Sequence, residues 1–583
     1  MSAIQQPSQG SAADARAALR SVPILADVDD EQLDQLSCVI DRIHIPANEW
    51  LFRFGDPSDA IYVIASGRFA AVGVDGRVIR EMASGDSIGD LGVIEDAPRS
   101  AGVRALRDGV VWRIAADTFR EVLAKTPRLQ SVMLRAMARM LRESQSAHVS
   151  QRPRVIGLLS TGDAAAGLIV DGIVTRLGPH GRTAVVAPPI ETIAEISNYG
   201  EFVDGFNEIL DRAERSNDWV LMVADRGSGD LWRRYVAAQC DRLVVLVAQR
   251  HPPEAFDLPV VQGRPVHLVT CTVDPDPSWW DLLQPVSHHA ADDDGIGALA
   301  RRIAGRSLGL VLAGGGARGL AHFGVYEELT RAGVVIDRFG GTSAGAIAAA
   351  VFALGLDARE AIAAARQYMT RGNLLDYTIP AVAFTRGGRV DRLVENFFGD
   401  TLIEHLSRGF FSVCADMVTG DQIVHRRGRL SIAVRASMSI PGLIPPLQHG
   451  EQMLVDGGML NNLPADVMCA DPDGDVVCVD LRRKFLPSRR FGSLPQAGPL
   501  PGLVRRLVTG SEVVLPSLQE TLLRTVSLTA AGGNLCALPQ VVAVIKPNVT
   551  EIAALDFKKI DAALEAGRVA ARAVLEANPK LLC

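Results

Sequence analysis

Apolar runs alternate with helical patterns in the C-terminal half of the chain, and the clearest alternation lies within residues 308–354. An apolar run at 308–313 ends in three glycines and precedes a helical pattern over 320–331. A second apolar run, 334–339, leads to a serine among small residues, and an alanine-rich helical pattern follows it. Strands that alternate with helices in this way predict a βαβα unit of a parallel sheet.

The N-terminal part of the chain shows many short β-like runs. Turn signals such as Gly55-Asp56-Pro57 and Asp75-Gly76 separate them. Short, evenly spaced strands predict a small barrel or jelly roll. The predicted strands are 41–44, 50–53, 60–65, 68–74, 78–82, 101–105 and 109–114, and helical patterns follow at 117–125 and 129–144.

A third pattern lies between these two regions. Apolar, β-branched runs alternate with helical patterns at 165–177 and 202–215, which predicts a second parallel α/β unit. The loop 160–167 lies where a P-loop would lie, but it lacks Gly-Lys-Ser/Thr, so we expect no nucleotide hydrolysis. The predicted strands are 155–159, 183–187, 219–224, 243–248 and 266–270.

The segment 272–297 is rich in proline, aspartate and glycine and predicts a linker. Its His288-His289 pair and the acidic run 292–294 leave a metal site as the alternative, and a solvated linker is favoured over it. We therefore expect no metal. The predicted organisation is a multidomain chain with a disordered tail (1–20), a β-barrel or jelly-roll domain (21–148), an α/β unit (152–272), a linker (273–304) and a C-terminal α/β domain (305–583).

Composition narrows the class of protein. The chain has 583 residues, of which 48% are hydrophobic and 22% charged, which indicates a globular protein with a large core. The formal net charge of −7 argues against nucleic acid as the main partner. Eight cysteines without a CxxC pair predict neither a disulfide framework nor a zinc site and suit a reducing cytoplasm. Neither a signal peptide nor an apolar run of ~20 residues is evident, so any membrane contact is expected to be peripheral. The sequence does not predict the oligomeric state.

The serine turn carries the candidate chemistry. Gly341-x-Ser343-x-Gly345 between a predicted strand and a predicted helix matches a nucleophile elbow. Small residues at Gly341 and Gly345 suit a tight turn between closely packed elements. The elbow places the Ser343 hydroxyl at a helix N-terminus, which favours developing negative charge.

The glycine loop has two interpretations. Gly314-x-Gly316-x-x-Gly319 fits a dinucleotide fingerprint with Asp337 near the ribose position. The same loop also fits an oxyanion hole, because glycine amides are sterically open and an arginine adds positive charge. The dinucleotide interpretation leaves Ser343 and the later Asp456 unexplained, so the oxyanion hole is favoured. Its candidate residues are Gly314, Gly315, Gly316, Arg318, Gly319 and Ala344.

A third motif lies far downstream, where an apolar run ends in Asp456-Gly457-Gly458. Taken alone it would be an ordinary turn. Together with the glycine loop and the elbow, it resembles the patatin-like phospholipases over roughly residues 308–480. The resemblance implies a Ser343–Asp456 dyad that hydrolyses acyl esters, an oxyanion hole in the glycine loop, and an acyl pocket lined by segment 435–446. The alternative is a Ser-Asp-His triad, with Asp416 or Asp421 as the acid and His425 or His449 as the base.

The segment 85–101 of the jelly-roll region resembles the phosphate-binding segment of cyclic-nucleotide-binding domains. Gly89 would let the backbone approach a phosphate, and Arg99 would offer it a charged fork, with Ser100 as a further candidate contact. Asp90 would accept from a ribose hydroxyl. The family normally has glutamate at Asp90 and alanine at Gly92. The resemblance implies a cyclic nucleotide as effector. Because of these two departures, the alternative is a domain that keeps the fold without the ligand.

The whole layout resembles bacterial members of the neuropathy target esterase family, which implies a serine esterase of lysophospholipids or phospholipids that requires no cofactor. The alternative function is that of a scaffold or binding protein that responds to a cyclic nucleotide and whose hydrolase fold is catalytically inactive, or silent. The segment 485–510 mixes apolar residues with arginines, and we expect either a surface loop or a lipid-facing lid there.

Overall fold

The computed structural model describes residues 40–125, 154–162, 166–187, 199–252, 264–272, 275–369, 375–379, 382–471, 473–481 and 535–582, except Arg77 and Arg226. The chain divides into two compact units, Met1–Ala300 and Arg301–Cys583. Three predicted segments lie outside the described residues: the tail 1–20, the helix 129–144 and the stretch 485–510.

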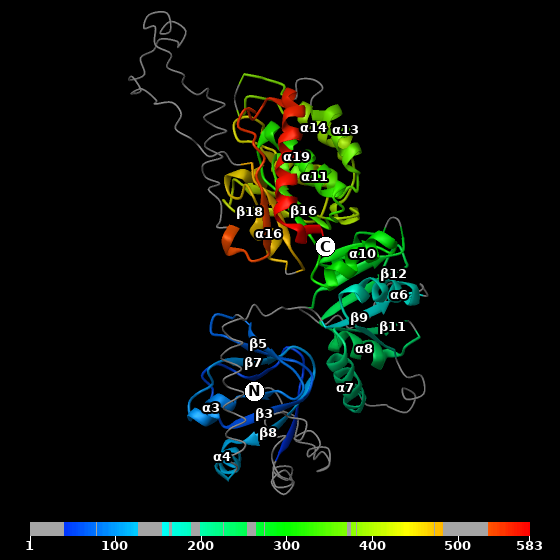
Figure 1. Cartoon of the computed structure of the whole chain (residues 1–583), viewed down its shortest axis with the longest axis vertical. Coiled ribbons are helices and arrows are strands. Elements are labelled where there is room, and N and C mark those ends of the chain that lie inside the picture. The colour runs from blue at the N-terminus through cyan, green and yellow to red at the C-terminus, as the bar shows by residue number, and fades with distance from the viewer. Residues whose placement is uncertain are drawn as a thin grey trace, which may run out of the picture. The chain divides into compact units, whose positions relative to one another are not determined.

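The first unit begins with a jelly roll of two four-stranded antiparallel sheets (Figure 1). Ala60, Tyr62 and Ile64 of β3 face the core between the sheets, and Ile61 and Val63 on the other face of this strand are buried as well. The predicted jelly roll is confirmed. One sheet contains β1 (Asp41–Ile45), β8 (Gly109–Ala115), β3 (Ala60–Ser66) and β6 (Ser87–Ile88). The other contains β2 (Trp50–Phe52), β7 (Gly102–Ala105), β4 (Phe69–Val72) and β5 (Val78–Met82), and the helices are α3 (Asp90–Glu95) and α4 (Ala116–Lys125).

The rest of the first unit is a six-stranded sheet in the order β10-β11-β9-β12-β13-β14, with parallel pairing throughout. Its central strands are entirely buried, as continuous apolar runs predict for a sheet covered on both faces. The strands are β9 (Val155–Ser160), β10 (Thr183–Val186), β11 (Trp219–Ala224), β12 (Arg242–Val247), β13 (Val266–Thr270) and β14 (Ser287–Ala290). The helices between them are α6 (Ala166–Leu177), α7 (Tyr199–Ser216) and α8 (Asp230–Gln239).

The predicted linker 273–304 is largely structured, which corrects the expectation. It contains α9 (Ser278–Leu283), strand β14 and α10 (Asp293–Ile303). Trp279 and Trp280 are buried, and β14 pairs with β13 at the edge of the sheet. The histidines expected in a linker or metal site bond within the sheet, because His288 pairs with Thr270 and His289 with Ser287. Within the described ranges, no three metal-ligating side chains form a group.

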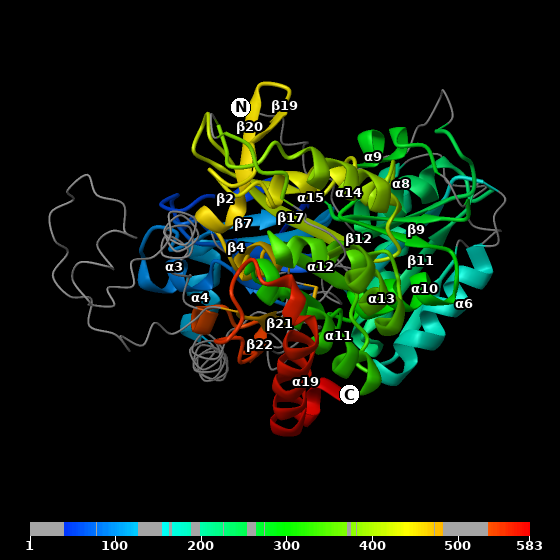
Figure 2. The same ribbon diagram turned by 90° about the horizontal axis from the view of Figure 1, so that it is seen from above.

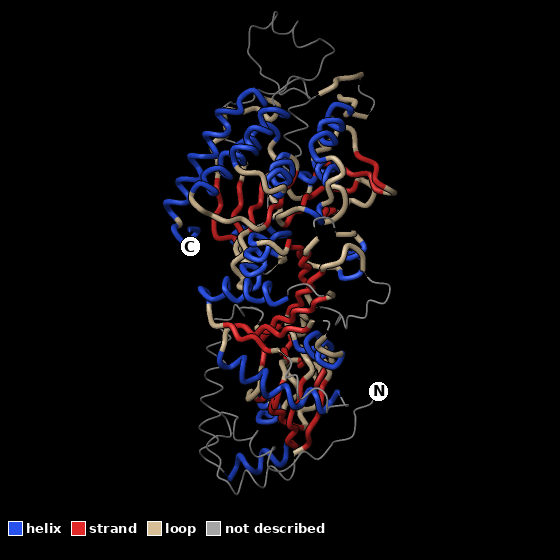
Figure 3. The backbone as a smooth tube through the Cα atoms, turned by 90° about the vertical axis from the view of Figure 1, so that its right-hand side faces the viewer, coloured by secondary structure: helices blue, strands red, loops and turns tan. Residues whose placement is uncertain are grey.

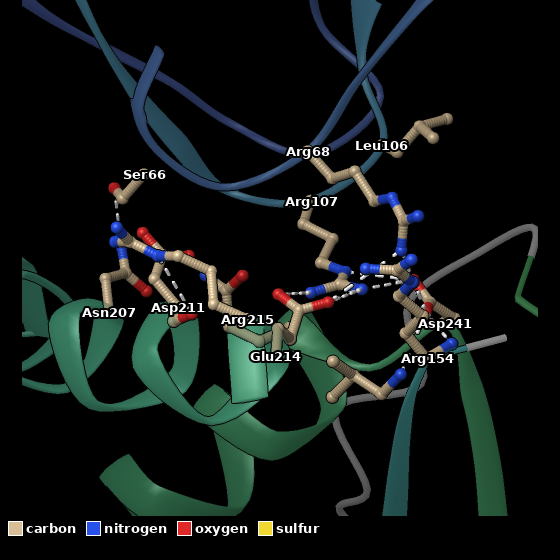
Figure 4. A network of polar contacts seen from close by, with 12 residues as sticks. Ser66, Arg68, Leu106, Arg107, Arg154, Asn207, Asp211, Glu214, Arg215 and Asp241 are labelled. Carbon is tan, nitrogen blue, oxygen red and sulfur yellow. Dashed lines mark hydrogen bonds and ion pairs between the residues drawn. The ribbon is translucent and has the colours of Figure 1, made fainter. Parts of the chain in front are cut away.

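A buried polar network joins the jelly roll to the α/β sheet within the first unit (Figure 4). Arg107 is 1% exposed and donates hydrogen bonds to both Glu214 and Asp241. Burial alone would raise the pKa of Asp241, but Arg107 and Arg68 lower it to about 2. Asn207 on α7 donates to the Ser66 hydroxyl beside this pair. Such buried, mutually satisfied charges fix how two surfaces dock, because each would be costly to leave unpaired.

The second unit is built on one mixed sheet in the order β19-β20-β17-β16-β15-β21-β22, with β18 also paired to β17. In Figure 3 the red strands of this unit lie between blue helices. The parallel strands are β15 (Gly309–Leu312), β16 (Arg338–Thr342), β17 (Gly409–Asp416), β21 (Val476–Val479) and β22 (Val541–Ile545). The antiparallel strands are β18 (Gln422–His425), β19 (Leu447–His449) and β20 (Gln452–Asp456).

Helices cover this sheet and bury a large apolar cluster against it. The C-terminal helix α19 packs along α11, and Figures 1 and 2 show the two side by side. No helix of the described part is both long and apolar enough to cross a membrane. The helices are α11 (Ala321–Arg331), α12 (Ala344–Ala353), α13 (Ala358–Met369), α14 (Gly388–Phe398), α15 (Leu430–Ser437), α16 (Ala465–Cys469) and α19 (Ile560–Ala577). Short 3₁₀ turns lie at Gly178–His180, Gly316–Leu320, Ile403–His405, Gly457–Met459, Leu535–Ala537, Phe557–Lys559 and Pro579–Leu582.

The strand that leads into the serine turn differs from its prediction. The apolar run 334–339 was expected to form it, but β16 spans Arg338–Thr342. Phe411 of the neighbouring strand lies over Gly340, where a Cβ would come within 2.2 Å of the ring. The strand therefore needs glycine at a position where glycine weakens the sequence signal for a strand.

Candidate active site

Strand β17 brings the serine turn and the acidic motif together. Its residue Val413 pairs with Thr342 at the end of β16, and the next residue, Cys414, pairs with Asp456 at the end of β20. The ends of two strands 114 residues apart in the chain, at Thr342 and Asp456, are therefore one residue apart along β17. Ser343, which follows Thr342, is placed beside Asp456 by this register.

The turn at Ser343 is a strained nucleophile elbow. Ser343 has φ 57° and ψ −121°, which side chains other than glycine rarely adopt. The flanking glycines leave room for the turn, because a Cβ on Gly345 would lie 2.1 Å from the Leu312 carbonyl oxygen. A Cβ on Gly341 would lie 2.5 Å from the backbone of Gly345. The spacing that predicted the elbow thus has a steric cause on both sides of the serine.

The Asp456 carboxylate is 2% exposed and lies close enough to the Ser343 hydroxyl for the serine to act on its pKa. Burial raises the pKa of Asp456 to about 6, although the nearby Ser343 hydroxyl and the hydrogen bond from the Gly458 N–H act in the opposite direction. The Gly458 bond measures 2.7 Å and fixes the carboxylate. A carboxylate with a raised pKa is a stronger base than one in water, so this pair can transfer a proton at neutral pH.

The backbone of the elbow is held by Ser437, the last residue of α15. The Ser437 hydroxyl accepts a hydrogen bond from the Ser343 N–H at 2.9 Å and donates one to the Val413 carbonyl at 2.6 Å. Ser437 is fully buried. It therefore ties the strained residue to β17, the strand that pairs with Asp456 at the end of β20. The sequence placed Ser437 in the acyl-pocket segment and gave no signal for this contact.

The glycine loop is shaped by contacts with its own chain. The Gly314 N–H donates to the Asn462 carbonyl at 3.0 Å, and the Asn462 amide donates back to the Gly314 carbonyl. The Arg318 guanidinium donates to the Gly315 carbonyl at 3.0 Å. These bonds change the predicted oxyanion set, because the Gly314 amide is occupied and Arg318 orients the loop.

The amides of Gly315, Gly316 and Ala344 have no acceptor among the described residues. Gly316 and Ala344 also line the same cavity as Ser343. Gly319 has a packing role, since a Cβ there would meet the Cβ of Ala344 at 2.6 Å. Of the six predicted oxyanion residues, Gly315, Gly316 and Ala344 remain candidate donors.

Asp337 does not support the dinucleotide interpretation. It precedes the first residue of β16, whereas the glycine loop follows the last residue of β15, and these parallel strands place the two at opposite sheet edges. The Asp337 carboxylate instead accepts a bidentate pair of hydrogen bonds from Arg301.

Two of the alternative triad residues, His425 and Asp416, have partners other than Ser343. The ring of His425 lies 3.2 Å from the Cys414 sulfur, and burial lowers the pKa of this histidine. The Asp416 carboxylate accepts from the backbone amides of Val418 and Met453. His449 is exposed on β19. Asp456 is therefore the carboxylate that the sheet register places at the serine.

An apolar cavity of about 800 Å³, its open mouth included, begins at Ser343. Apart from Gly316, Ser343 and Ala344, aliphatic, methionine and phenylalanine side chains line it. Helix α14 supplies one wall and α15 the neighbouring one, and Figure 2 shows these helices adjacent. The segment 435–446, expected to line an acyl pocket, contributes Met438, Ile440, Leu443 and Ile444. The cavity offers apolar contacts to a chain attached at the serine.

The predicted phosphate-binding segment in the first unit is bonded to itself. Arg99 is 3% exposed, donates to the carbonyls of Gly89 and Ala60, and lies 4.1 Å from the Phe52 ring centroid. Asp90 is buried and accepts from the Ser87 hydroxyl and the Leu91 N–H. Ser100 is exposed. Gly89 has φ 79°, and a Cβ there would lie 2.1 Å from Arg99, so this glycine makes room for the arginine.

Gly92 has a local explanation as well. A Cβ there would lie 2.2 Å from the Ser58 hydroxyl, which donates to the Ala97 carbonyl. The glycine at this position, where alanine is usual, accommodates Ser58.

Comparisons with known proteins agree with both halves of this description. A patatin-like phospholipase model matches residues 310–468, and a cyclic nucleotide-binding domain model matches residues 42–126. An uncharacterized NTE family protein of Mycobacterium tuberculosis (strain H37Rv) is 68% identical over 98% of this chain and 98% of its own length. The chain belongs to the NTE family.

More distant relatives share part of their length with this NTE family chain. A lysophospholipase of Aspergillus niger is 26% identical over 74% of this chain and 34% of its own length. A solved structure of the regulatory domain of Toxoplasma gondii PKA with cAMP is 26% identical over 20% of this chain and 46% of that chain, with a TM-score of 0.19. The family and the patatin-like match make this chain a lipid ester hydrolase.

Proposed function

We propose that this chain hydrolyses the acyl ester of lysophospholipids, with Ser343 as nucleophile and Asp456 as general base. The observation that carries the proposal is the proximity of the buried Asp456 to Ser343, which lines an apolar cavity. The cavity can hold one acyl chain while the ester carbonyl lies at the serine. A single-chain lipid suits a single cavity, and the Aspergillus niger relative is named a lysophospholipase.

The first half of the reaction transfers the acyl group to the enzyme. Asp456 takes the proton of the Ser343 hydroxyl as the serine oxygen attacks the ester carbonyl. The negative charge that develops on the carbonyl oxygen is stabilised by the candidate donors Gly315, Gly316 and Ala344 and by the N-terminus of α12. The ester C–O bond then breaks, and the leaving glycerol oxygen takes the proton from Asp456.

The second half releases the fatty acid. A water molecule gives its proton to Asp456 and attacks the acyl-enzyme carbonyl, and the Ser343 oxygen leaves and regains that proton. No residue in this scheme needs a cofactor, and we propose none.

For the jelly-roll domain we propose that a cyclic nucleotide acts as effector only if Arg99 exchanges its internal partners for the phosphate. Its guanidinium would have to leave the Gly89 and Ala60 carbonyls and the face of Phe52. Those interactions compete with a phosphate, so we expect weak binding.

The proposed activity is tested by fatty-acid release from lysophosphatidylcholine. We expect the native chain to release one fatty acid per lipid and Ser343→Ala to release none above background. The substitution removes only an oxygen atom, so matching circular dichroism spectra would show that the fold is retained. A chain that hydrolyses neither this lipid nor a diacyl phospholipid, and that no fluorophosphonate labels, would be the silent scaffold.

A further inference from the structure

An exposed apolar loop lies next to the wall of the acyl cavity. Three of its side chains extend into solvent: Ile379 is 91% exposed, Val382 is 71% exposed and Tyr377 is 52% exposed. Large apolar side chains exposed together mark an interaction surface more often than isolated ones do. We call residues 375–379 and 382–386 the rim loop.

The rim loop is tied to the cavity wall at both of its ends. Leu375, at its start, lines the cavity. Near its end, the Thr385 hydroxyl donates to the carbonyl of the cavity residue Leu443 at 2.7 Å, and the Phe384 N–H donates to the Gly442 carbonyl at 2.8 Å. The exposed side chains are therefore held close to the cavity wall.

The loop also has an ordered backbone of its own. Tyr377 and Thr385 form an antiparallel bridge, and the Thr378 N–H donates to the Phe384 carbonyl at 2.9 Å. Asp376 accepts hydrogen bonds from the backbone amides of Gly387 and Arg389 at the start of α14. A loop braced in this way holds Ile379 and Val382 outward without burying them in the protein.

The charge next to the loop is positive. Arg386, Arg389 and Arg392 are exposed at the end of the rim loop and on the first turns of α14. The acidic side chains of the same stretch have partners within the fold: Asp376 binds backbone amides, and Asp391 pairs with Arg435. Apolar side chains flanked by arginines are the combination that binds the boundary between lipid headgroups and acyl chains in anionic membranes.

We propose that the rim loop docks this chain on the surface of an anionic lipid membrane and brings the mouth of the acyl cavity to the lipid. Ile379 and Val382 enter the headgroup boundary, and the arginines contact lipid phosphates. This inference rests on the proposed function, because it specifies how that site would reach its lipid. A soluble ester can reach Ser343 without the loop, so docking and chemistry can be separated by experiment.

The test compares binding to vesicles of phosphatidylglycerol and of phosphatidylcholine by co-sedimentation of the full chain. We expect the native chain and Ser343→Ala to bind phosphatidylglycerol vesicles alike. The double variant Ile379→Asp/Val382→Asp should bind at least tenfold more weakly, and Arg386→Gln/Arg392→Gln should lose the preference for the anionic lipid. The matched control is Val569→Asp, which alters a side chain 55% exposed on α19, and it should bind like the native chain.

Hydrolysis of a short soluble ester is measured on the rim-loop variant, the arginine variant and Val569→Asp, but not on Ser343→Ala. None of the substituted side chains lines the cavity, so we expect this rate to stay within about twofold and to show that the variants fold. Vesicle binding by Ile379→Asp/Val382→Asp equal to that of the native chain would overturn the proposal. A native chain that binds neither kind of vesicle would also overturn it. A rim-loop variant that changes only the elution volume would overturn it as well, because the loop would then be a contact between copies of the chain.

The two proposals fail in different ways. A chain that binds vesicles through the rim loop but hydrolyses no lysophospholipid would refute the proposed function and leave the docking surface. A chain that hydrolyses lysophospholipid but ignores the rim-loop substitutions would refute only the docking surface.

Discussion

The serine elbow of the second unit and the phosphate-binding segment of the first use similar residues in opposite ways. Each contains a buried carboxylate and glycines whose missing Cβ leaves room for a close neighbour, and each has a residue with a positive φ. At the elbow, Ser343 lines an open cavity and the Asp456 carboxylate lies beside it. In the other segment, Arg99 and Asp90 bond to their own chain. A motif therefore specifies which groups are present, and the fold decides whether a ligand can reach them.

The largest expected effect within this comparison concerns Gly314 and Gly315, two neighbouring residues of the glycine loop that should respond differently to an added Cβ. Gly314→Ala would place a Cβ 2.4 Å from the Asn462 side chain and 3.2 Å from the Ser343 Cβ. Gly315→Ala would place it 3.0 Å from the end of the flexible Leu481 side chain, on an extended backbone. We expect the clash in Gly314→Ala to displace Ser343 and the glycine loop and to lower turnover ~10²–10³-fold, as much as the removal of one oxyanion donor does. Gly315→Ala keeps its N–H and should lose much less. Equal losses measured with a soluble ester would show that the loop tolerates no Cβ at either position.

Ser437→Ala should have the next largest effect. It leaves the buried Ser343 N–H without its acceptor, which costs ~1–3 kcal/mol, or about tenfold to a hundredfold in turnover if the elbow shifts. The rate constant for fluorophosphonate labelling of Ser343 should fall in parallel. Ser412→Ala is the matched control, because this buried serine bonds to the Ala433 carbonyl on α15 and not to the elbow. A normal labelling rate in Ser437→Ala would remove the positioning role.

The pH dependence of turnover should follow Asp456. The base must be ionised, and burial raises its pKa to about 6, so turnover should rise as pH increases through about 6. Below that value it should fall by about tenfold per pH unit, as for any single titrating base. The measurement is the kcat of a soluble ester between pH 4.5 and 8, in a range where circular dichroism shows the native fold. A kcat that does not change across pH 6 would mean that Asp456 is not the general base.

The smallest expected effect concerns the phosphate-binding segment of the first unit. Arg99→Met removes two hydrogen bonds from a buried guanidinium, so the melting temperature of the jelly roll should drop by several degrees without any ligand. Arg113→Met is the control, because Arg113 makes a more exposed ion pair with Asp59 and should cost less. Native-like melting of Arg99→Met, together with a rise in the native melting temperature at millimolar cAMP, would instead assign Arg99 to phosphate binding.

The proximity of the candidate catalytic residues was the most predictable part of the molecule. Short motifs contain Ser343, Asp456 and the segment 435–446. The elbow motif reflects a local steric need, because a Cβ on Gly345 would lie 2.1 Å from the Leu312 carbonyl oxygen. What the motifs do not contain is the partner across the fold. The Gly314 amide is taken by Asn462, and the Ser343 backbone is held by Ser437, 94 residues away.

The strand and linker errors have a common cause. The pattern 273–304 is polar and proline-rich, but Trp279, Trp280 and Leu283 anchor it in the core, and β14 completes a sheet that local composition does not reveal. Strand β16 begins four residues later than the apolar run, because its glycines are dictated by Phe411 and Gly345 on other elements. In both cases tertiary packing overrides local propensity.

The central claim is that Asp456, and no histidine, activates Ser343. The direct measurement compares the second-order rate of fluorophosphonate labelling and the kcat for a soluble ester in Asp456→Asn, His425→Ala and His449→Ala. The ionised Asp456 is destabilised by burial, and the stability present below pH 3.8 is lost as pH rises through about 6, so Asp456→Asn should melt no lower than the native chain at pH 7.5. We predict that Asp456→Asn loses ~10²–10⁴-fold in both rates while each histidine variant keeps at least a third of them. A stable Asp456→Asn that keeps most of its activity, beside a histidine variant that loses it, would contradict the dyad and establish a triad.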